Sequence, residues 1–240
     1  MPTSYALDIV AKKLGIPCFE VPTGWKFFGN LMDSGTGAFA GTPVYTPFIC
    51  GEESFGTGAD HVREKDGMWA VLAWLQILAS KNTDTSKPLV GVKQVCEAHW
   101  KEFGRNYYAR YDYEGVDKPA AEKMMADMVA AQPTIQGTEV APGMKISVAD
   151  MFAYNDSVDG SVSKNQGVRF IFEDGSRIVF RLSGTGVAGA TIRLYLEKYA
   201  PPDADLALHP FDVVKPFGDI ALKISGLEAA TGRTAPTVIT

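Results

Sequence analysis

The sequence predicts an α/β segment followed by a small α+β domain. In residues 1–103, helical patterns and short apolar segments alternate, which is typical of an α/β unit with a mixed sheet between helices. In residues 104–240, period-two apolar segments joined by turn signals predict a four-stranded antiparallel sheet with helices on one face. The 240 residues are 46% hydrophobic and 21% charged, close to an average globular protein, which excludes disorder and fibrous structure.

Charge and cysteine content narrow the class of protein. The formal net charge of −5 argues against nucleic-acid binding. The three cysteines lie far apart without metal-ligand spacing, as expected for reduced thiols. The start of the chain carries no signal-peptide pattern, and the longest apolar stretch, residues 68–79, is too short to cross a bilayer. We therefore expect a soluble, cytoplasmic protein with no nucleic-acid partner and no membrane span.

The elements of the first segment follow from apolar periodicity and stop signals. A helix over residues 4–14 ends at Gly15 and leads to a strand at 18–21, as in an α/β unit whose preceding strand is absent from the chain. The helix over residues 66–80 is apolar on nearly all sides, which predicts burial between layers. The remaining predicted elements of the segment are the apolar run 44–50 and the helix 90–103.

The elements of the second domain follow from the alternation of apolar and polar residues and from the positions of turn-forming and helix-ending residues. Asp174-Gly175 is a hairpin signal between two apolar segments. A helix begins at Asp117 and is expected to stop near Ala131, before Pro133, and a last helix is expected over residues 211–229. The predicted strands are 144–153, 168–173, 178–180 and 191–198, with a further strand-like segment around Tyr107, Tyr111 and Tyr113.

A glycine-rich loop follows the third predicted strand, in the run Arg181-Leu182-Ser183-Gly184-Thr185-Gly186. The glycine spacing resembles the fingerprint of dinucleotide-binding sites, but that fingerprint needs a helix after the glycines. A strand pattern follows here, so this interpretation is rejected. Backbone N–H groups, the hydroxyls of Ser183 and Thr185, and the guanidinium groups of Arg181 and Arg193 instead suit a phosphate dianion. The alternative is an ordinary glycine-rich hairpin with two solvated arginines.

Three features of the first segment suit a polar ligand. Glu52 and Ser54 stand two residues apart after an apolar strand end, which places a carboxylate and a hydroxyl where neighbouring sugar hydroxyls could bind. Lys65 belongs to a short basic cluster with His61 and Arg63, and Thr23-Gly24 is a tight turn. From local chemistry alone, an acidic surface loop, a solvated cation group and a simple turn are equally good interpretations.

Taken together, these motifs resemble the C-terminal half of the eukaryotic-type phosphoglucomutases, members of the α-D-phosphohexomutase superfamily. The resemblance extends along nearly the whole chain. It rests on Pro22-Thr23-Gly24-Trp25-Lys26, Cys50-Gly51-Glu52-Glu53-Ser54-Phe55-Gly56-Thr57-Gly58, Arg63-Glu64-Lys65-Asp66-Gly67, the arginine loop from Arg181 to Gly186 and the C-terminal run Gly232–Thr240.

The resemblance implies interconversion of glucose 1-phosphate and glucose 6-phosphate through a phosphoserine, Mg²⁺ and glucose 1,6-bisphosphate. It implies that residues 1–103 are the C-terminal part of the sugar-binding third domain and residues 104–240 the phosphate-binding domain, for which we expect a TATA-binding-protein-like fold. By this resemblance Lys65 lies near the transferring phosphoryl group. The sugar would be bound by Thr23, Gly24, Glu52 and Ser54, and the non-reacting phosphate by Arg181, Ser183, Gly184, Thr185 and Arg193.

The chain also departs from the family pattern. It lacks the phosphoserine loop Thr-Ala-Ser-His-Asn and the metal loop Asp-Gly-Asp-x-Asp, and its stretch from Ser34 to Ile49 is longer than expected. We therefore expect a chain that binds sugar phosphates, has no metal ligands, is inactive alone and has the N-terminal half of the same enzyme as its partner. The alternatives are a non-catalytic, parafusin-like scaffold in secretion or signalling, and an autonomous phosphate-binding module.

Overall fold

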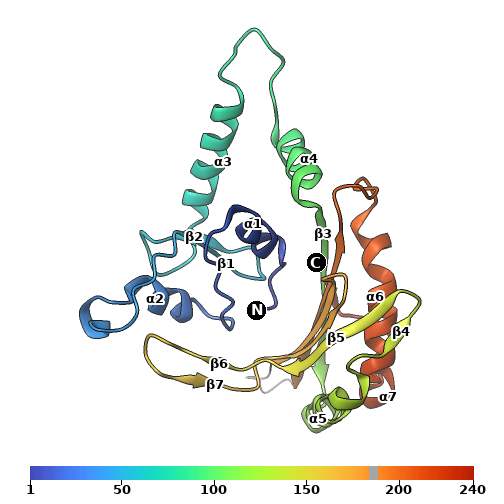
Figure 1. Ribbon diagram of the computed structural model, residues 1–240. Coiled ribbons are helices and arrows are strands. Elements are labelled where there is room, and N and C mark those ends of the chain that lie inside the picture. Colours follow the sequence, from blue (N-terminus) through green and yellow to red (C-terminus); the bar gives the residue numbers. More distant parts are fainter. Residues whose placement is uncertain (184–188) are drawn as a thin grey trace. The chain divides into compact units, whose positions relative to one another are not determined.

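The computed structural model describes residues 1–183 and 189–240 and separates into two compact units (Figure 1). The first unit comprises residues 1–104 together with residues 154–163. The second unit comprises residues 105–153 and 164–240. The chain therefore passes between the units three times, at 104/105, 153/154 and 163/164, and each unit is described by itself.

The first unit is built from helices and two short hairpins. The β1–β2 and β6–β7 pairs are both antiparallel and two-stranded. In chain order its elements are α1 (Ala6–Leu14), α2 (Trp25–Asp33), the 3₁₀ turn η1 (Gly37–Phe39), β1 (Ile49–Gly51), β2 (Thr57–Ala59), α3 (Gly67–Lys81), α4 (Val92–Phe103), β6 (Tyr154–Asn155) and β7 (Val162–Ser163).

Three predictions for the first unit are wrong. Its described residues form antiparallel hairpins instead of a mixed sheet between helices, and the predicted strand 18–21 pairs with no neighbour among them. The predicted burial of the helix at 66–80 also fails, because every residue of α3 is at least partly exposed, with Met68 71% and Leu72 61% exposed. Helix α3 is as apolar as the sequence indicates, but no sheet among the described residues covers it.

Residues 154–163 complete the small core of the first unit. Val158 is buried with Val21, Phe27 and Leu31. The amide Nδ2 of Asn30 donates to Asp156 Oδ2 and to Asp159 Oδ2, at 2.9 Å each. The hairpin tip thus supplies one apolar side chain and two carboxylates to α2.

The long stretch from Ser34 to Ile49 folds back onto the same core. Ser34 is buried, and its Oγ donates to Leu31 O and accepts from the N–H of Tyr45, at 2.7 and 2.8 Å. Phe39 and Tyr45 pack against the Val158 cluster. This stretch is therefore attached by a buried hydroxyl and two aromatic rings.

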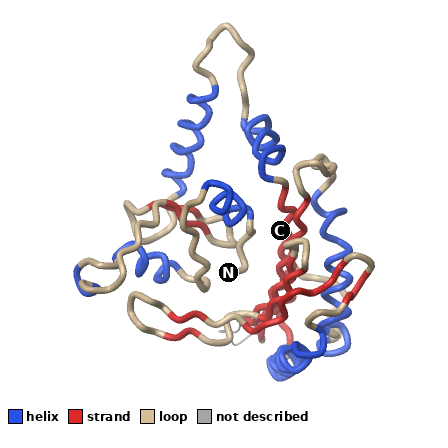
Figure 2. Tube along the Cα trace, viewed as in Figure 1, coloured by secondary structure: helices blue, strands red, loops and turns tan. Residues whose placement is uncertain are grey.

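The second unit is a seven-stranded antiparallel sheet in the order β11-β3-β10-β9-β8-β5-β4. Figure 2 shows its helices gathered on one side of these strands. Its elements are β3 (Arg105–Val116), α5 (Lys118–Ile135), β4 (Glu139–Ala141), β5 (Met144–Met151), β8 (Val168–Phe172), β9 (Arg177–Ser183), β10 (Ala190–Ala200), α6 (Pro210–Ser225), α7 (Leu227–Thr231) and β11 (Val238–Ile239).

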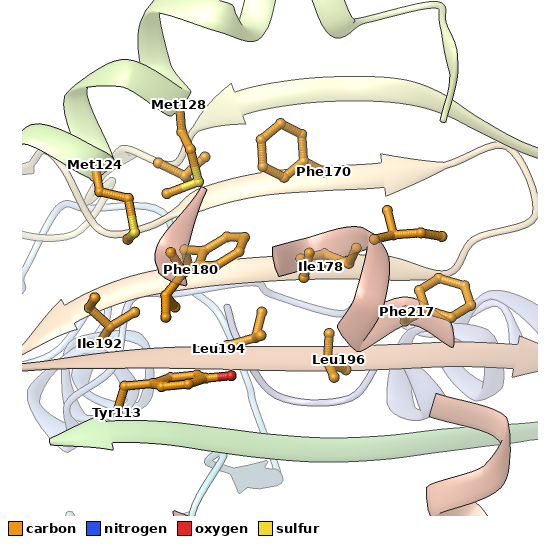
Figure 3. Packing of buried hydrophobic residues seen from close by; sticks show 14 of the residues in the cluster. Tyr113, Met124, Met128, Phe170, Ile178, Phe180, Ile192, Leu194, Leu196 and Phe217 are labelled. Carbon is orange, nitrogen blue, oxygen red and sulfur yellow. The ribbon is translucent and has the colours of Figure 1, made fainter. Parts of the chain in front are cut away.

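The helix-covered face of this sheet holds the main core (Figure 3). Phe180, Leu194 and Leu196 are fully buried beneath helix residues such as Met124 and Phe217. Because strand side chains alternate between faces, the residues between them lie on the opposite face. The opposite face is polar, and its members include the buried pair Arg177–Glu197, whose Nε and Oε2 are 2.6 Å apart.

The predictions for the second unit need three corrections. The sheet has seven strands instead of four, because β3 and the short edge strands β4 and β11 join it. Helix α5 continues through Pro133 to Ile135, and Gly226, with φ of +60°, divides the predicted last helix into α6 and α7. Pro133 lies in the last turn of α5, where its missing N–H costs one helical hydrogen bond and does not interrupt a long helix.

Candidate functional site

The β1–β2 hairpin of the first unit presents Glu52 and Ser54. The hairpin loop is closed by a hydrogen bond from Glu52 N to Gly56 O of 2.9 Å, and Phe55 adopts a left-handed φ of +65°. The hydroxyl of Ser54 donates to Glu52 Oε1 at 3.0 Å. The turn therefore places a carboxylate and a hydroxyl in contact.

Lys65 lies against the same carboxylate. Its Nζ is 3.4 Å from Glu52 Oε1 and 3.3 Å from Glu64 Oε1. These carboxylates, Glu64 first, raise the pKa of Lys65 above its usual value, so the ammonium stays protonated at neutral pH. The ammonium is half exposed, and the Glu52 side chain is only 13% exposed. A fixed cation and a shielded carboxylate thus share one site.

The tight turn at Thr23-Gly24 and this loop line one cavity of about 330 Å³ in the first unit. Thr23 and Gly24 line it together with Glu52 and Glu53. Gly24 precedes α2 with a φ of +119°, a conformation that L residues rarely adopt, so glycine is required at this turn. The structure therefore gathers Thr23, Gly24 and Glu52 around one cavity, with Ser54 and Lys65 joined to it through Glu52.

The other members of the basic cluster serve the fold. His61 Nε2 lies 2.9 Å from Asp66 Oδ2, and Asp66 caps α3 by accepting from Trp69 N at 3.0 Å. Arg63 donates to Asp33 Oδ1 through Nε and Nη2, at 3.0 and 2.6 Å. Of the three basic residues singled out in the sequence, only Lys65 contacts Glu52.

The arginines predicted to bind phosphate are direct neighbours in the second unit. Arg181 on β9 and Arg193 on β10 are opposite each other in the antiparallel register, and Ser183 is opposite Thr191 one step along. All four side chains therefore lie on the polar face of the sheet. The predicted contacts of Gly184 and Thr185 lie outside the described residues.

Two like charges at directly opposed sheet positions repel each other unless an anion lies between them. Arg181 donates through Nε to Gln166 O at 3.1 Å. The Nε of Arg193 is buried and has no hydrogen-bond partner among the described residues. The pair therefore has the charge and the donor capacity to accept a phosphate monoester.

Sequence reasoning missed one part of this face, Arg110 and Asp112 on β3. Asp112 is opposite Arg193, on the side away from Arg181. Its Oδ1 lies 3.0 Å from Arg110 Nε. The period-two spacing of charged residues after Tyr107 indicates that they share one face of a strand. It does not indicate the register with β10, which places Asp112 opposite Arg193.

Two searches of the described residues returned no candidate. Within residues 1–183 and 189–240, no three His, Cys, Asp or Glu side chains are placed to hold a metal ion. A search of the same residues finds no helix long and apolar enough to cross a membrane.

Comparison with known proteins assigns the class. Residues 1–103 match the model of the phosphoglucomutase/phosphomannomutase alpha/beta/alpha domain III, which places the chain among the phosphohexose mutases. Residues 105–237 match the C-terminal domain of phosphoglucomutase-1, and the chain belongs to the phosphoglucomutase family.

Individual relatives agree with this assignment. The chain is 53% identical to a probable cytoplasmic phosphoglucomutase of Arabidopsis thaliana and 54% identical to a cytoplasmic phosphoglucomutase of Bromus inermis. All of this chain aligns, but it spans only 41% of each relative. The crystal structure of the Paramecium exocytosis-sensitive phosphoprotein pp63/parafusin, a phosphoglucomutase, is 52% identical with a TM-score of 0.87, covering all of this chain and 39% of that one.

Proposed function

We propose that this chain is the sugar-phosphate-binding portion of a phosphoglucomutase. The complete enzyme would interconvert glucose 1-phosphate and glucose 6-phosphate through a phosphoserine and glucose 1,6-bisphosphate. The observation that carries the proposal is the pair Arg181–Arg193, opposed on neighbouring strands, in which the buried Nε of Arg193 has no hydrogen-bond partner among the described residues. Residues 1–103 would be the C-terminal part of the sugar-binding third domain, and residues 104–240 the phosphate-binding domain.

The second unit would bind the phosphate that does not react. Arg181 and Arg193 offer planar, permanently charged donors to a dianion, and Ser183 adds a hydroxyl beside them. Gly184 and Thr185 would supply backbone and hydroxyl donors. We place no phosphoryl transfer at this site, because its role is to hold the phosphate at one end of the sugar.

The first unit would bind the sugar ring. The shielded carboxylate of Glu52 accepts from sugar hydroxyls, Ser54 adds a donor, and Thr23 and Gly24 shape the cavity wall. Lys65, held protonated beside Glu52, would stabilise the negative charge of a phosphoryl group in transfer.

A binding titration tests the phosphate site. Glucose 1-phosphate is titrated into the 240-residue chain and followed by NMR chemical shifts. Arg181→Ala and Arg193→Ala are each expected to weaken binding about tenfold, because each removes a charge-assisted donor pair. Arg233→Ala removes an exposed arginine that donates to Glu114 O and Gly115 O, and it serves as the control. Undiminished affinity in both site variants would refute the phosphate assignment.

A glycine substitution tests the sugar site without removing a charge. A Cβ at Gly56 would lie 2.5 Å from Glu52 Oε1 and 2.9 Å from Lys65 Cδ, so Gly56→Ala must displace both side chains. We expect weaker binding of glucose 1-phosphate and unchanged binding of inorganic phosphate. Gly67→Ala is the matched control, since its Cβ would meet nothing within 4 Å. Equal sugar-phosphate affinity in the two variants would count against the role of Glu52 and Lys65.

We further propose that catalysis needs the remaining part of a full-length enzyme. The phosphoserine and the Mg²⁺ ligands would come from an N-terminal half, because this sequence lacks the phosphoserine loop and the metal loop of the family. The exposed apolar side chains of α3, with Leu72 61% and Leu75 56% exposed, would pack against that half. The relatives are longer than this chain, which supports the same conclusion.

Complementation tests this partnership. The chain alone is expected to show no mutase activity in a coupled assay. Activity should appear on mixing with the separately produced N-terminal part of the Arabidopsis relative, and Leu72→Lys/Leu75→Lys should abolish the rescue. Activity of the chain alone, free of longer enzyme, would overturn the proposal.

Location and fold complete the proposal. The relatives are named cytoplasmic phosphoglucomutases, which supports a cytoplasmic location. The one-sided helix cover of the second unit supports a TATA-binding-protein-like architecture. A purely scaffolding, parafusin-like role is less favoured, because a scaffold has no need of the opposed arginines.

A further inference from the structure

The polar face of the second unit carries one acidic side chain beside the phosphate-binding arginines. Asp112 on β3 is directly opposite Arg193 on β10, so the two side chains are neighbours on the same face. The Asp112 side chain is only 7% exposed. A buried carboxylate next to an anion-binding arginine competes with phosphate, because it could form an ion pair with the guanidinium group in place of the phosphate.

The structure gives this carboxylate a different partner. Arg110 stands two residues before Asp112 on the same strand, and its Nε lies 3.0 Å from Asp112 Oδ1. This contact is a close ion pair without hydrogen-bond alignment, since Arg110 Nε, Asp112 Oδ1 and Arg193 Nε are all buried and make no hydrogen bond among the described residues. Asp112 thus lies between two arginines and pairs with the one farther from Arg181.

The backbone on either side of this ion pair is fixed by the C-terminal strand. Thr237 N donates to Asp112 O at 2.7 Å, Arg110 N donates to Thr240 O at 2.7 Å, and Thr240 N donates back to Arg110 O at 3.0 Å. Strand β11 pairs with β3 at Asp112 and Tyr111. The pair is therefore built on a paired strand segment, and both of its members are largely buried.

We propose that Arg110 is a positioning residue that keeps Asp112 away from Arg193 and so leaves the Arg193 guanidinium available to phosphate. Three arginines, Arg110, Arg181 and Arg193, and one aspartate give the cluster a net charge of +2, which matches a phosphate dianion. Without Arg110 the carboxylate turns to Arg193, and the site loses one of its two guanidinium groups. This inference rests on the proposed phosphate site.

The test uses the same NMR titration with glucose 1-phosphate. Arg110→Met removes the charge and keeps much of the side-chain volume, and it is expected to weaken binding about tenfold. The double variant Arg110→Met/Asp112→Asn, which also removes the competing carboxylate, is expected to bind within about twofold of the original chain. A purely structural role of Arg110 predicts no such rescue.

Arg169→Met is the matched control. Arg169 lies on the same sheet face and donates to Asp150 through Nε and Nη2, at 2.8 and 2.6 Å, but it is not next to Arg193. The Arg169→Met variant should bind glucose 1-phosphate with the affinity of the original chain. The folding of each variant is checked by circular dichroism.

The outcomes separate the two proposals. If Arg181→Ala and Arg193→Ala bind normally, the phosphate site itself is wrong. If these two lose affinity while Arg110→Met does not, only the role of Arg110 is refuted. A loss in Arg110→Met that Asp112→Asn fails to rescue, or an equal loss in Arg169→Met, also refutes it.

Discussion

The two units differ in how completely they bury their apolar side chains. In the second unit the alternating strand residues meet α5, α6 and α7 on one face, and Phe180, Leu194 and Leu196 are fully buried. In the first unit the most apolar helix, α3, is exposed along its length. The difference shows that an apolar helix is buried only where another layer covers it, whatever its own pattern predicts.

The largest expected effect tests this difference directly. Phe180→Ala should destabilise the second unit by about 3–5 kcal/mol, because it opens a cavity in a closed core. Leu72→Ala in α3 should change stability by less than about 0.5 kcal/mol, because Leu72 is already 61% exposed.

The chain contains its own reporters for this measurement. All four tryptophans, Trp25, Trp69, Trp74 and Trp100, belong to the first unit. Urea unfolding followed by tryptophan emission therefore reports the first unit, and the circular-dichroism signal of the strands is dominated by the second. Phe180→Ala should shift the circular-dichroism transition more than the emission transition. An equal shift in both would mean that the units unfold as one.

An intermediate effect is expected where residues 154–163 join the first unit. Val158→Ala removes two buried methyl groups from the cluster of Val21, Phe27 and Leu31 and should cost about 2 kcal/mol. The loss should appear in the tryptophan emission transition. Val162→Ala on the same hairpin is the control, since Val162 is 56% exposed. Indistinguishable behaviour of the two variants would contradict the assignment of this hairpin to the first unit.

The smallest effect compares two thiols of the first unit. Burial raises the pKa of Cys50 to about 11; partial burial and the nearby Asp8 also raise the pKa of Cys18, but Cys18 is exposed. Because the raised pKa keeps Cys50 protonated at neutral pH, iodoacetamide should label Cys18 first at pH 8, and the labelling rate of Cys50 should keep rising up to about pH 11. Mass spectrometry of the labelled chain measures both rates. Equally fast labelling of Cys50 at pH 8 would mean that the β1–β2 hairpin opens readily.

Sequence patterns predicted the local features of this chain better than its long-range pairing. The helix ending at Gly15 and the hairpin at Asp174-Gly175 follow from short-range signals, and the structure has both. The opposition of Arg181 and Arg193 depends on the register between β9 and β10. That register is set by core packing, so the two arginines could be proposed together but their alignment could not be derived.

The failures have a common physical cause. The burial of α3, the mixed sheet and the four-stranded count each needed knowledge of which other elements lie alongside. Residues 156–159 are far from α2 in the sequence, yet Asp156, Val158 and Asp159 all contact α2 or its core. Neither the pairing partner of a strand nor a contact between residues far apart in the chain produces a periodic pattern in the sequence.

The discontinuous make-up of the first unit has a consequence for dissecting the gene. A cut after codon 104 gives two pieces of coherent sequence, but it separates Val158 and Asp156 from the helix that they contact. The shorter piece then lacks part of its core, and the longer piece carries a hairpin without its packing surface. Either piece expressed alone should aggregate, and co-expression of the two pieces should recover both in soluble form.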